Sequence, residues 1–253
     1  IFVSPGDEVI EGQILVEIKN NKLRDHIDKL INTKSIILTQ KELLIDQNQI
    51  LQKRLSIIEE TNKNLLKLQE TFNCIDNSRI PVLMAIHGGC IGGAVDFASA
   101  CDMRYCTEDA FFCIQEINIG MTADVGTFPR LPHLLPMGLV KELAFTGRRL
   151  FSKEAKEIGL VNNIFSSQEE MLREVMLIAK EITKKSPLAI WGSKEAINYT
   201  RGRTIEEGLN QIALWQSGMY NPQVDMKEAL SSQIENKEPE FEDLYPLKKE
   251  FGL

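Results

Sequence analysis

The sequence has no long apolar run, no paired-cysteine motif and few histidines, and these absences narrow the classes of function. Its 253 residues contain no apolar stretch near the ~20 residues that a membrane-spanning helix needs. None of the five cysteines belongs to a C-x-x-C pair, and three histidines leave little to complete a metal site. We therefore expect no membrane span, no metal and mostly buried free thiols.

Basic residues are fewer than acidic residues in this chain. The chain has 29 Lys+Arg against 36 Asp+Glu, a net charge of -7. A nucleic-acid surface needs concentrated positive charge, so we expect no nucleic-acid partner. The first residues lack a signal-peptide pattern, and the final Phe251-Gly252-Leu253 is not the SKL peroxisomal address. With free thiols, this predicts a reducing compartment, either the cytoplasm or the matrix of a mitochondrion or peroxisome.

The first nineteen residues have the pattern of a short β segment. Residues 13–19 alternate polar and apolar side chains, with Ile14, Val16 and Ile18 on one face, which is typical of a half-buried strand. Together with the turn at Pro5-Gly6-Asp7, this segment resembles the first half of the hairpin module in HlyD-like membrane-fusion adaptors. Lys19 lacks the Met-Lys-Met context of a biotin carrier, so no carrier function is expected.

Residues 20–70 contain neither glycine nor proline. A heptad seam from Leu23 to Leu65 has apolar residues at nine of its thirteen positions. This predicts a long amphipathic helix or helix pair. Two interpretations stay open: an oligomerisation or adaptor arm, and a helix that packs on its own domain.

Residues 80–130 combine apolar runs with a glycine-rich turn. Residues 82–86 predict a buried strand that starts after Pro81, and residues 110–114 form a second apolar run. Between them, the turn over residues 87–93 leads into a helix of small residues that starts at Gly93. The N–H of Gly93 would then lie at the positive end of this helix, where backbone donors can hold a developing oxyanion.

Three acids stand in this stretch: Asp96 in the small-residue helix, Glu116 after the second apolar run, and Asp124 in a following loop. Each alone is more often a cap or a dipole partner than a catalyst. Together, beside a glycine-rich donor, they favour acid–base chemistry on a carbonyl compound. Asp102 closes the helix next to Arg104 and is interpreted as structural.

The same residues resemble the crotonase (enoyl-CoA hydratase/isomerase) superfamily. The pattern I-x-G-x-x-x-G-G-x-x-D/E-x-x-x-x-C-D runs from Ile86 to Asp102, and E-x-x-x-G runs from Glu116 to Gly120. Within the superfamily, residues 123–127 (ADVGT) and residues 68–73 (LQETFN) are closest to members that isomerise 3,5-dienoyl-CoA. The resemblance covers about residues 67–240. It implies an α/β fold: a crotonase-like (ββα) spiral core with a C-terminal helical region, here preceded by the β segment and the long helix.

The resemblance also implies roles. The substrate would be a fatty acyl-CoA thioester in β-oxidation, with coenzyme A as part of the substrate and no separate cofactor. Gly93, with Gly92 beside it, would form the oxyanion hole; Asp124 would take a proton from the α side of the thioester, and Glu116 would return one further along the chain. Asp96 stands where the hydratases have a catalytic glutamate and would support the other two. The second oxyanion donor of relatives comes from a C/S-A-G-x-D/L loop, and residues 1–66 contain no such loop.

The remaining residues predict mainly helices. A helix is expected over residues 138–146, and a strand over residues 160–165. Further helix starts are expected at Ser152 as a cap, at Ser186-Pro187, and at two capping boxes, Ser167 with Glu170 and Thr204 with Glu207. We expect three domains: residues 1–66 as an adaptor-like segment, 67–200 as the core, and 201–253 as a helical region that in relatives supports homotrimers or homohexamers.

The sequence therefore predicts an acyl-CoA isomerase that converts 3,5-dienoyl-CoA to 2,4-dienoyl-CoA. Two alternatives stay open. One is an enoyl-CoA hydratase, which needs two acids that hold a water molecule. The other is a non-catalytic oligomeric assembly protein with a degenerate crotonase fold.

Overall fold

The computed structural model describes residue 8, residues 21–219 and residues 223–246. The chain divides into two compact units, residues 1–63 and residues 64–253. The β segment expected over residues 13–19 lies outside the described residues. The three-domain division stays a prediction.

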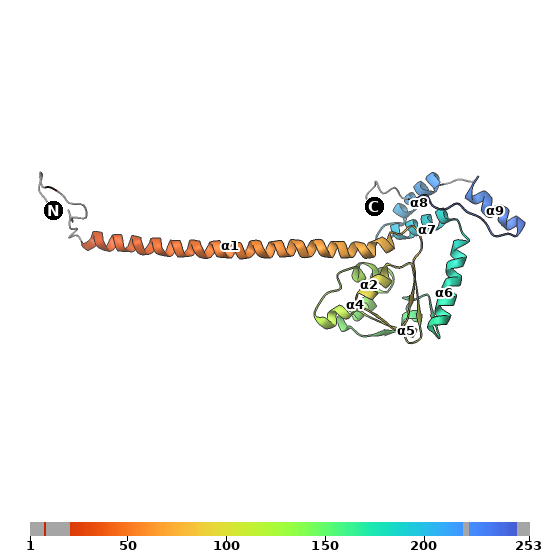
Figure 1. Cartoon of the computed structure of the whole chain (residues 1–253), viewed down its shortest axis with the longest axis horizontal. Coiled ribbons are helices and arrows are strands. Elements are labelled where there is room, and N and C mark those ends of the chain that lie inside the picture. The colour runs from red at the N-terminus through yellow and green to blue at the C-terminus, as the bar shows by residue number, and fades with distance from the viewer. Residues whose placement is uncertain (1–7, 9–20, 220–222, 247–253) are drawn as a thin grey trace. The chain divides into compact units, whose positions relative to one another are not determined.

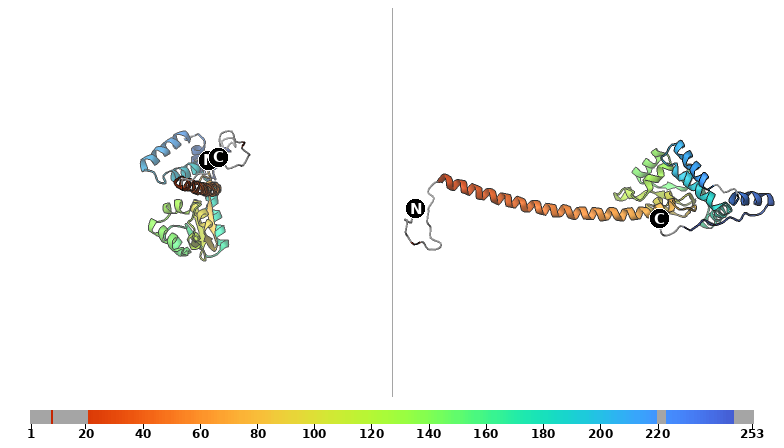
Figure 2. Two further views of the ribbon diagram at one scale, coloured as in Figure 1. Left: turned by 90° about the vertical axis from the view of Figure 1, so that its left-hand side faces the viewer. Right: turned by 90° about the horizontal axis from the view of Figure 1, so that it is seen from above.

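Helix α1 (Asn21–Asp76) has 56 residues and starts within one residue of the glycine- and proline-free stretch. It is one helix rather than a helix pair, and the right-hand view of Figure 2 shows it without a break. Its apolar residues come in consecutive groups, such as those at 36–38 and 43–45, so they spread over more than one side. The helix is therefore only weakly amphipathic, and its described side chains up to residue 64 are exposed.

In the part of the chain that the structure describes, six short strands form two small sheets. The first sheet is parallel and has the order β1 (Leu83–Ile86), β3 (Met103–Thr107), β6 (Asn163–Phe165). The second has the order β2 (Gly89–Ile91), β4 (Phe111–Cys113), β5 (Leu150–Phe151), with β5 antiparallel to β4.

The first four strands alternate between the two sheets. β1 and β2 enter different sheets, and β3 and β4 then pair alongside them in parallel. Helix α2 (Gly93–Ala100) connects the first strand pair to the second. This is the ββα arrangement expected from the sequence.

Helices and two 3₁₀ turns complete the described residues, several of them labelled in Figure 1. They are η1 (Gln115–Ile119), α3 (Thr127–Arg130), η2 (Leu131–His133), α4 (Met137–Thr146), α5 (Ser152–Glu157), α6 (Gln168–Thr183), α7 (Pro187–Tyr199), α8 (Ile205–Met219) and α9 (Asp225–Glu235).

Most of the predicted helix starts are confirmed. Ser167 accepts from the N–H of Glu170 at 3.2 Å, and Ser186 caps α7 with proline at its first position. Thr204 and Glu207 form a reciprocal capping box. Ser152 is not a cap: it is the first residue of α5, and its hydroxyl donates to the carbonyl of Glu108 at 2.6 Å.

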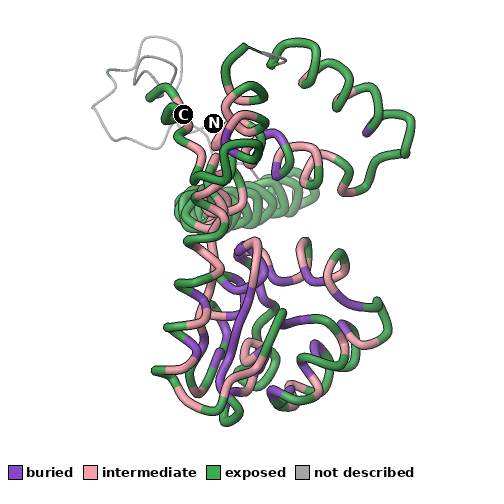
Figure 3. The backbone as a smooth tube through the Cα atoms, turned by 90° about the vertical axis from the view of Figure 1, so that its right-hand side faces the viewer, coloured by how far each residue is buried: buried purple, intermediate pink, exposed green. Residues whose placement is uncertain are grey.

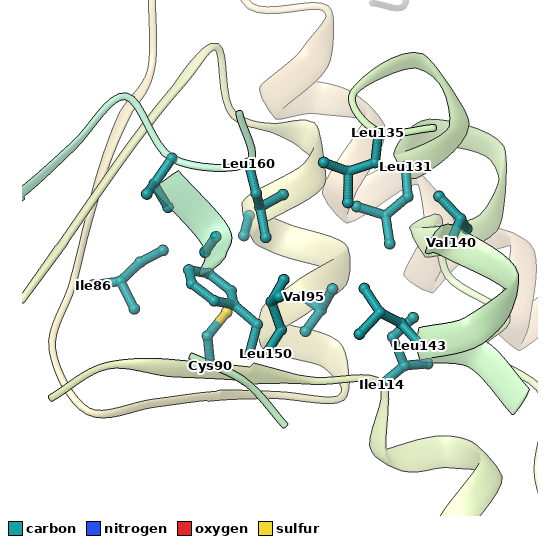
Figure 4. Close-up of a cluster of buried hydrophobic side chains, with 14 of the residues drawn as sticks. Ile86, Cys90, Val95, Ile114, Leu131, Leu135, Val140, Leu143, Leu150 and Leu160 are labelled. Carbon is teal, nitrogen blue, oxygen red and sulfur yellow. The ribbon is translucent and has the colours of Figure 1, made fainter. Parts of the chain in front are cut away.

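The hydrophobic core lies between the strands and α2, α4 and α5 (Figure 4). Figure 3 shows the buried segments concentrated here, whereas α1 is green along most of its length. The strand predicted over residues 82–86 is present as β1, but the predicted burial holds for only part of it. Of β1 only Ile86 is buried, and among the described residues β1 pairs on one edge alone, with β3.

Candidate active site

The start of α2 presents a free backbone donor at Gly93. Gly92 has φ 55° and donates its N–H to the carbonyl of Cys113 at 2.9 Å, so this N–H is engaged. Gly93 is exposed, and as the first helical residue it has no intrahelical acceptor for its N–H. A side chain at position 93 would meet no atom within 4 Å. Of the two predicted donors, Gly93 therefore keeps its N–H available beside open space, and the N–H of Gly92 does not.

Glu116 lies directly against this helix start. It stands in the turn η1, half-buried, and its Oε2 is buried without a hydrogen-bond partner among the described residues. A Cβ atom at position 92 would be 3.1 Å from Oε1 of Glu116. Glycine at position 92 thus provides both the positive φ and the close approach of this carboxyl group.

Asp96 is in the first turn of α2 and is 0% exposed. Its Oδ1 accepts two hydrogen bonds from Thr127, from the N–H at 2.6 Å and from the hydroxyl at 2.7 Å, while Oδ2 is buried without a partner. Burial raises the pKa of this carboxyl, the bonds from Thr127 oppose the rise, and the charge of Asp124 adds to it. Asp96 therefore holds the first residue of α3 rather than facing open space.

Asp124 is exposed in the loop that precedes α3, between buried Ala123 and Val125. Its backbone carbonyl accepts a hydrogen bond from the side-chain amide of Gln69 at 2.7 Å. The residue lines a cavity of about 280 Å³. Since its charge acts on Asp96, and Thr127 joins the same loop to α2, this carboxylate belongs to the surroundings of the α2 start.

The structure thus brings Gly93, Glu116 and Asp96 together around α2, and it ties the Asp124 loop to the same helix. Asp124 is exposed and Glu116 is half-buried, so both residues are open to solvent at least in part. Asp96 is 0% exposed, with its Oδ1 bonded to Thr127 and its Oδ2 enclosed. The catalytic roles assigned to these residues stay predictions.

Sequence reasoning missed a polar cluster on the last two turns of α1. Gln69, Asn73 and Asp76 are half-buried and line the same cavity as Asp124, together with Arg130 and Arg201. Continuing the heptad seam beyond Leu65 leads to positions 69, 72 and 76, where the side chains are polar, aromatic and acidic. Polar residues at expected inward positions were the signal for a polar contact there.

A larger cavity lies elsewhere. It has a volume of about 820 Å³ and is lined by the end of α2 and by α7. Lys194 in its wall is buried and donates to Oδ2 of Asp102 at 2.8 Å, and the same oxygen accepts from the N–H of Val82. This agrees with the structural role predicted for Asp102, and the three acids do not line this cavity.

All five cysteines are free; four are buried and Cys74 is exposed. Among residues 21–219 and 223–246, no helix is both long and apolar enough to cross a membrane. The same part of the chain has no cluster of three His, Cys, Asp or Glu side chains arranged to hold a metal ion.

Comparison with known proteins identifies similar chains. The enoyl-CoA hydratase/isomerase family model matches residues 32–244. The mitochondrial Delta(3,5)-Delta(2,4)-dienoyl-CoA isomerase of Homo sapiens is 44% identical over 175 residues, which are 69% of this chain and 53% of the relative. The peroxisomal isomerase of the same name from Arabidopsis thaliana is 42% identical over 186 residues, 74% of this chain and 66% of the relative.

A solved structure agrees with this fold. The crystal structure of an enoyl-CoA hydratase from Bacillus anthracis superposes with a TM-score of 0.68 at 29% identity, covering 72% of this chain and 70% of the other. The chain spans about half the length of the mammalian isomerases that it matches.

Proposed function

The chain belongs to the enoyl-CoA hydratase/isomerase family, and from this premise we propose that it converts 3,5-dienoyl-CoA to 2,4-dienoyl-CoA. The observation that carries the proposal is the difference in exposure among the three acids. Asp96 is fully buried and bonded to Thr127, whereas Asp124 is exposed and Glu116 is half-buried beside the start of α2. The named isomerases to which the chain is similar add support.

The proposed reaction moves protons without oxidation or reduction. The N–H of Gly93 donates to the thioester oxygen and thereby acidifies the C–H at C2. Asp124 removes this proton, and the electrons spread over the conjugated dienolate from the thioester oxygen to C6. Glu116 donates a proton at C6, which leaves double bonds at C2 and C4. One proton leaves and one arrives, so atoms and charge balance.

Each acid needs a different protonation state before the reaction. Asp124 is exposed, as suits a carboxylate that acts as a base. Glu116 is half-buried with its Oε1 next to Gly92, and the proposal assigns it the role of the acid. In this proposal Asp124 acts as the base and Glu116 as the acid on a substrate held by Gly93.

Hydration of a 2-enoyl-CoA fits the site less well. That reaction needs two acids that hold one water molecule, and the residue at the hydratase position is Asp96. Its carboxyl group is enclosed and bonded to Thr127, so it offers no oxygen to a water on the substrate side. Isomerisation needs only Glu116 and Asp124.

Three further expectations accompany the proposal. We propose a homotrimer or homohexamer, because the family's C-terminal helices support such assemblies, and a mitochondrial or peroxisomal matrix location, because similar isomerases carry those names. The adaptor role of residues 1–66 stays a prediction, and the family match begins at residue 32, inside that segment. An assembly role for α1 predicts that deletion of residues 21–63 changes the oligomeric state measured by light scattering.

The direct test is an absorbance assay. The purified chain is given a 3,5-dienoyl-CoA, and formation of the conjugated 2,4-dienoyl product is followed in the ultraviolet. Asp124→Asn should lower the rate about 10²–10⁴-fold, since it removes the base. Asp46→Asn, an exposed aspartate in α1, is the matched control and should leave the rate unchanged. A wild-type rate equal to that of Asp124→Asn would refute the isomerase proposal, and conversion of a 2-enoyl-CoA to a hydroxyacyl product would favour the hydratase.

A further inference from the structure

We propose that Gln69, Asn73 and Asp76, on the last two turns of α1, are positioning residues that fix the loop carrying Asp124. The inference rests on the proposed function, because it assigns a purpose to the placement of the candidate base. It concerns residues outside the glycine-rich motif and the three acids.

The carboxylate of Asp124 depends on its backbone for its position. Its side chain is exposed and makes no hydrogen bond or ion pair with any described residue, while its backbone carbonyl accepts from Gln69. Because only its backbone is bonded, the Asp124 carboxylate moves whenever the loop moves. The structure must therefore hold the loop itself.

Helix α1 holds the loop at two points. Gln69 donates to the carbonyl of Asp124 at 2.7 Å. Arg130, six residues after Asp124, is the second point. It donates from Nη2 to Oδ1 of Asn73 at 2.7 Å and from Nε to Oδ2 of Asp76 at 3.2 Å. Residues 69, 73 and 76 are spaced by one helical turn, so all three lie on one face of α1.

The contact with Arg130 is sheltered and charge-assisted. The side chains of Arg130 and Asp76 are 11% and 16% exposed. Arg201, in the turn after α7, adds two donations from Nη1 to both oxygens of Asp76, at 2.9 and 2.8 Å. Ion pairs of this kind are strong when each partner has several hydrogen bonds.

The segment between the two points has little freedom. Gly126 has φ 144°, and a Cβ atom there would collide with the guanidinium of Arg130. From the opposite side, Asp96 holds the N–H and hydroxyl of Thr127. The loop is thus fixed between a buried carboxylate of α2 and a polar face of α1.

This arrangement matters because proton transfer depends on placement. A displacement of about 1 Å from the productive geometry can cost about 100-fold in rate. The expected signature of a positioning role is a fall in kcat with little change in KM, since the acyl-CoA contacts at Gly93 stay in place.

The test compares Gln69→Ala and Asp76→Asn with Asn64→Ala, an exposed residue of α1 without a recorded contact. Hydrogen–deuterium exchange of the full chain reports on the amides of residues 122–130 independently of activity. We expect about tenfold faster exchange there in both variants, unchanged exchange in β3, and an about tenfold lower kcat with KM within twofold. Restoring a donor with Gln69→Asn should leave a smaller defect than Gln69→Ala.

Two failures can be told apart. If exchange over residues 122–130 is the same in Gln69→Ala, Asp76→Asn and Asn64→Ala, the positioning inference is overturned whatever the activity. If exchange accelerates as expected but the wild-type chain produces no 2,4-dienoyl-CoA, the loop contacts are upheld and the proposed function is overturned. If exchange accelerates in β3 as much as over residues 122–130, and KM rises as much as kcat falls, the two side chains have a general structural role and the positioning inference is overturned.

Discussion

Helix α1 and the strand-and-helix region of residues 83–165 use apolar side chains in different ways. Along α1 up to residue 64, leucine and isoleucine recur in groups, yet their described side chains are exposed; Leu51 is 59% exposed. In residues 83–165 the same residue types enclose a core, and Leu150 is 1% exposed. The comparison teaches that regularly spaced apolar residues are enough to form a helix. The candidate active site, in contrast, lies in a region where apolar side chains from several elements pack into a core.

The two regions also treat their carboxylates differently. Asp46, in the outer part of α1, is exposed without a recorded partner. Asp96 and Asp76 are enclosed, and each holds a part of the loop from residue 124 to residue 130. Because a buried carboxylate needs hydrogen-bond partners, these two acids bind parts of the loop, whereas Asp46 remains solvated.

Thiol reactivity should show the largest contrast. Burial raises the pKa of Cys90 to about 12 and those of Cys101 and Cys106 to about 11. At pH 8 the thiolate fraction of Cys90 is then about one in ten thousand, and the thiol is also shielded from reagent. We expect a thiol reagent to label Cys74 alone in the native chain and all five cysteines after denaturation. Fast native labelling of several cysteines would contradict the packed core.

Leucine truncation should show the next contrast. Leu150→Ala removes a fully buried side chain and should lower the free energy of unfolding by about 2–5 kcal/mol. Leu51→Ala makes the same change on the exposed helix and should alter it by less than about 0.5 kcal/mol. Denaturant unfolding measures both. A large loss from Leu51→Ala would mean that the outer part of α1 is packed.

Aspartate truncation should have a smaller but definite effect. Asp76→Ala leaves Arg130 and Arg201 without their shared carboxylate and should cost about 1–3 kcal/mol of folding free energy. Asp46→Ala is the matched control and should change little. If the two variants unfold at the same denaturant concentration, the Asp76 network does not contribute to the fold.

These contrasts also show what sequence can and cannot provide. The start of α2 at Gly93, the extent of α4 and the caps at Ser167 and Thr204 were predictable, because they depend on neighbours within a few residues. The hydrogen bond from Gly92 to Cys113 and the ion pair between Arg130 and Asp76 were not. The latter partners are 54 residues apart, so only the folded chain brings them together.

Two errors have the same origin. Ser152 carries the residue type of a cap, but the fold turns its hydroxyl to the carbonyl of Glu108. The run at residues 82–86 has the composition of a buried strand, but its exposure depends on which strands pair beside it. Local propensity fixed the element in both cases, and tertiary neighbours fixed the contacts.

The smallest expected effect concerns pH. The folded pKa of Asp96 is raised, chiefly by burial, so the folded chain retains this proton at a pH where the unfolded chain has lost it. Stability should therefore fall as pH rises from the unfolded pKa, near the ordinary aspartate value of 3.8, through the raised folded pKa. In Asp96→Asn this part of the slope should disappear, as measured by unfolding at several pH values. An identical slope in both proteins would contradict the assignment.

The most direct test of the central claim, a base at Asp124 and an acid at Glu116 around the Gly93 donor, is proton exchange in D₂O followed by mass spectrometry. With 3,5-dienoyl-CoA, the wild-type chain should form a 2,4-dienoyl product that carries one deuterium at C6. Glu116→Gln should still exchange the C2 proton of recovered substrate while it forms little product, and Asp124→Asn should do neither. C2 exchange that survives in Asp124→Asn but is lost in Glu116→Gln would contradict the account.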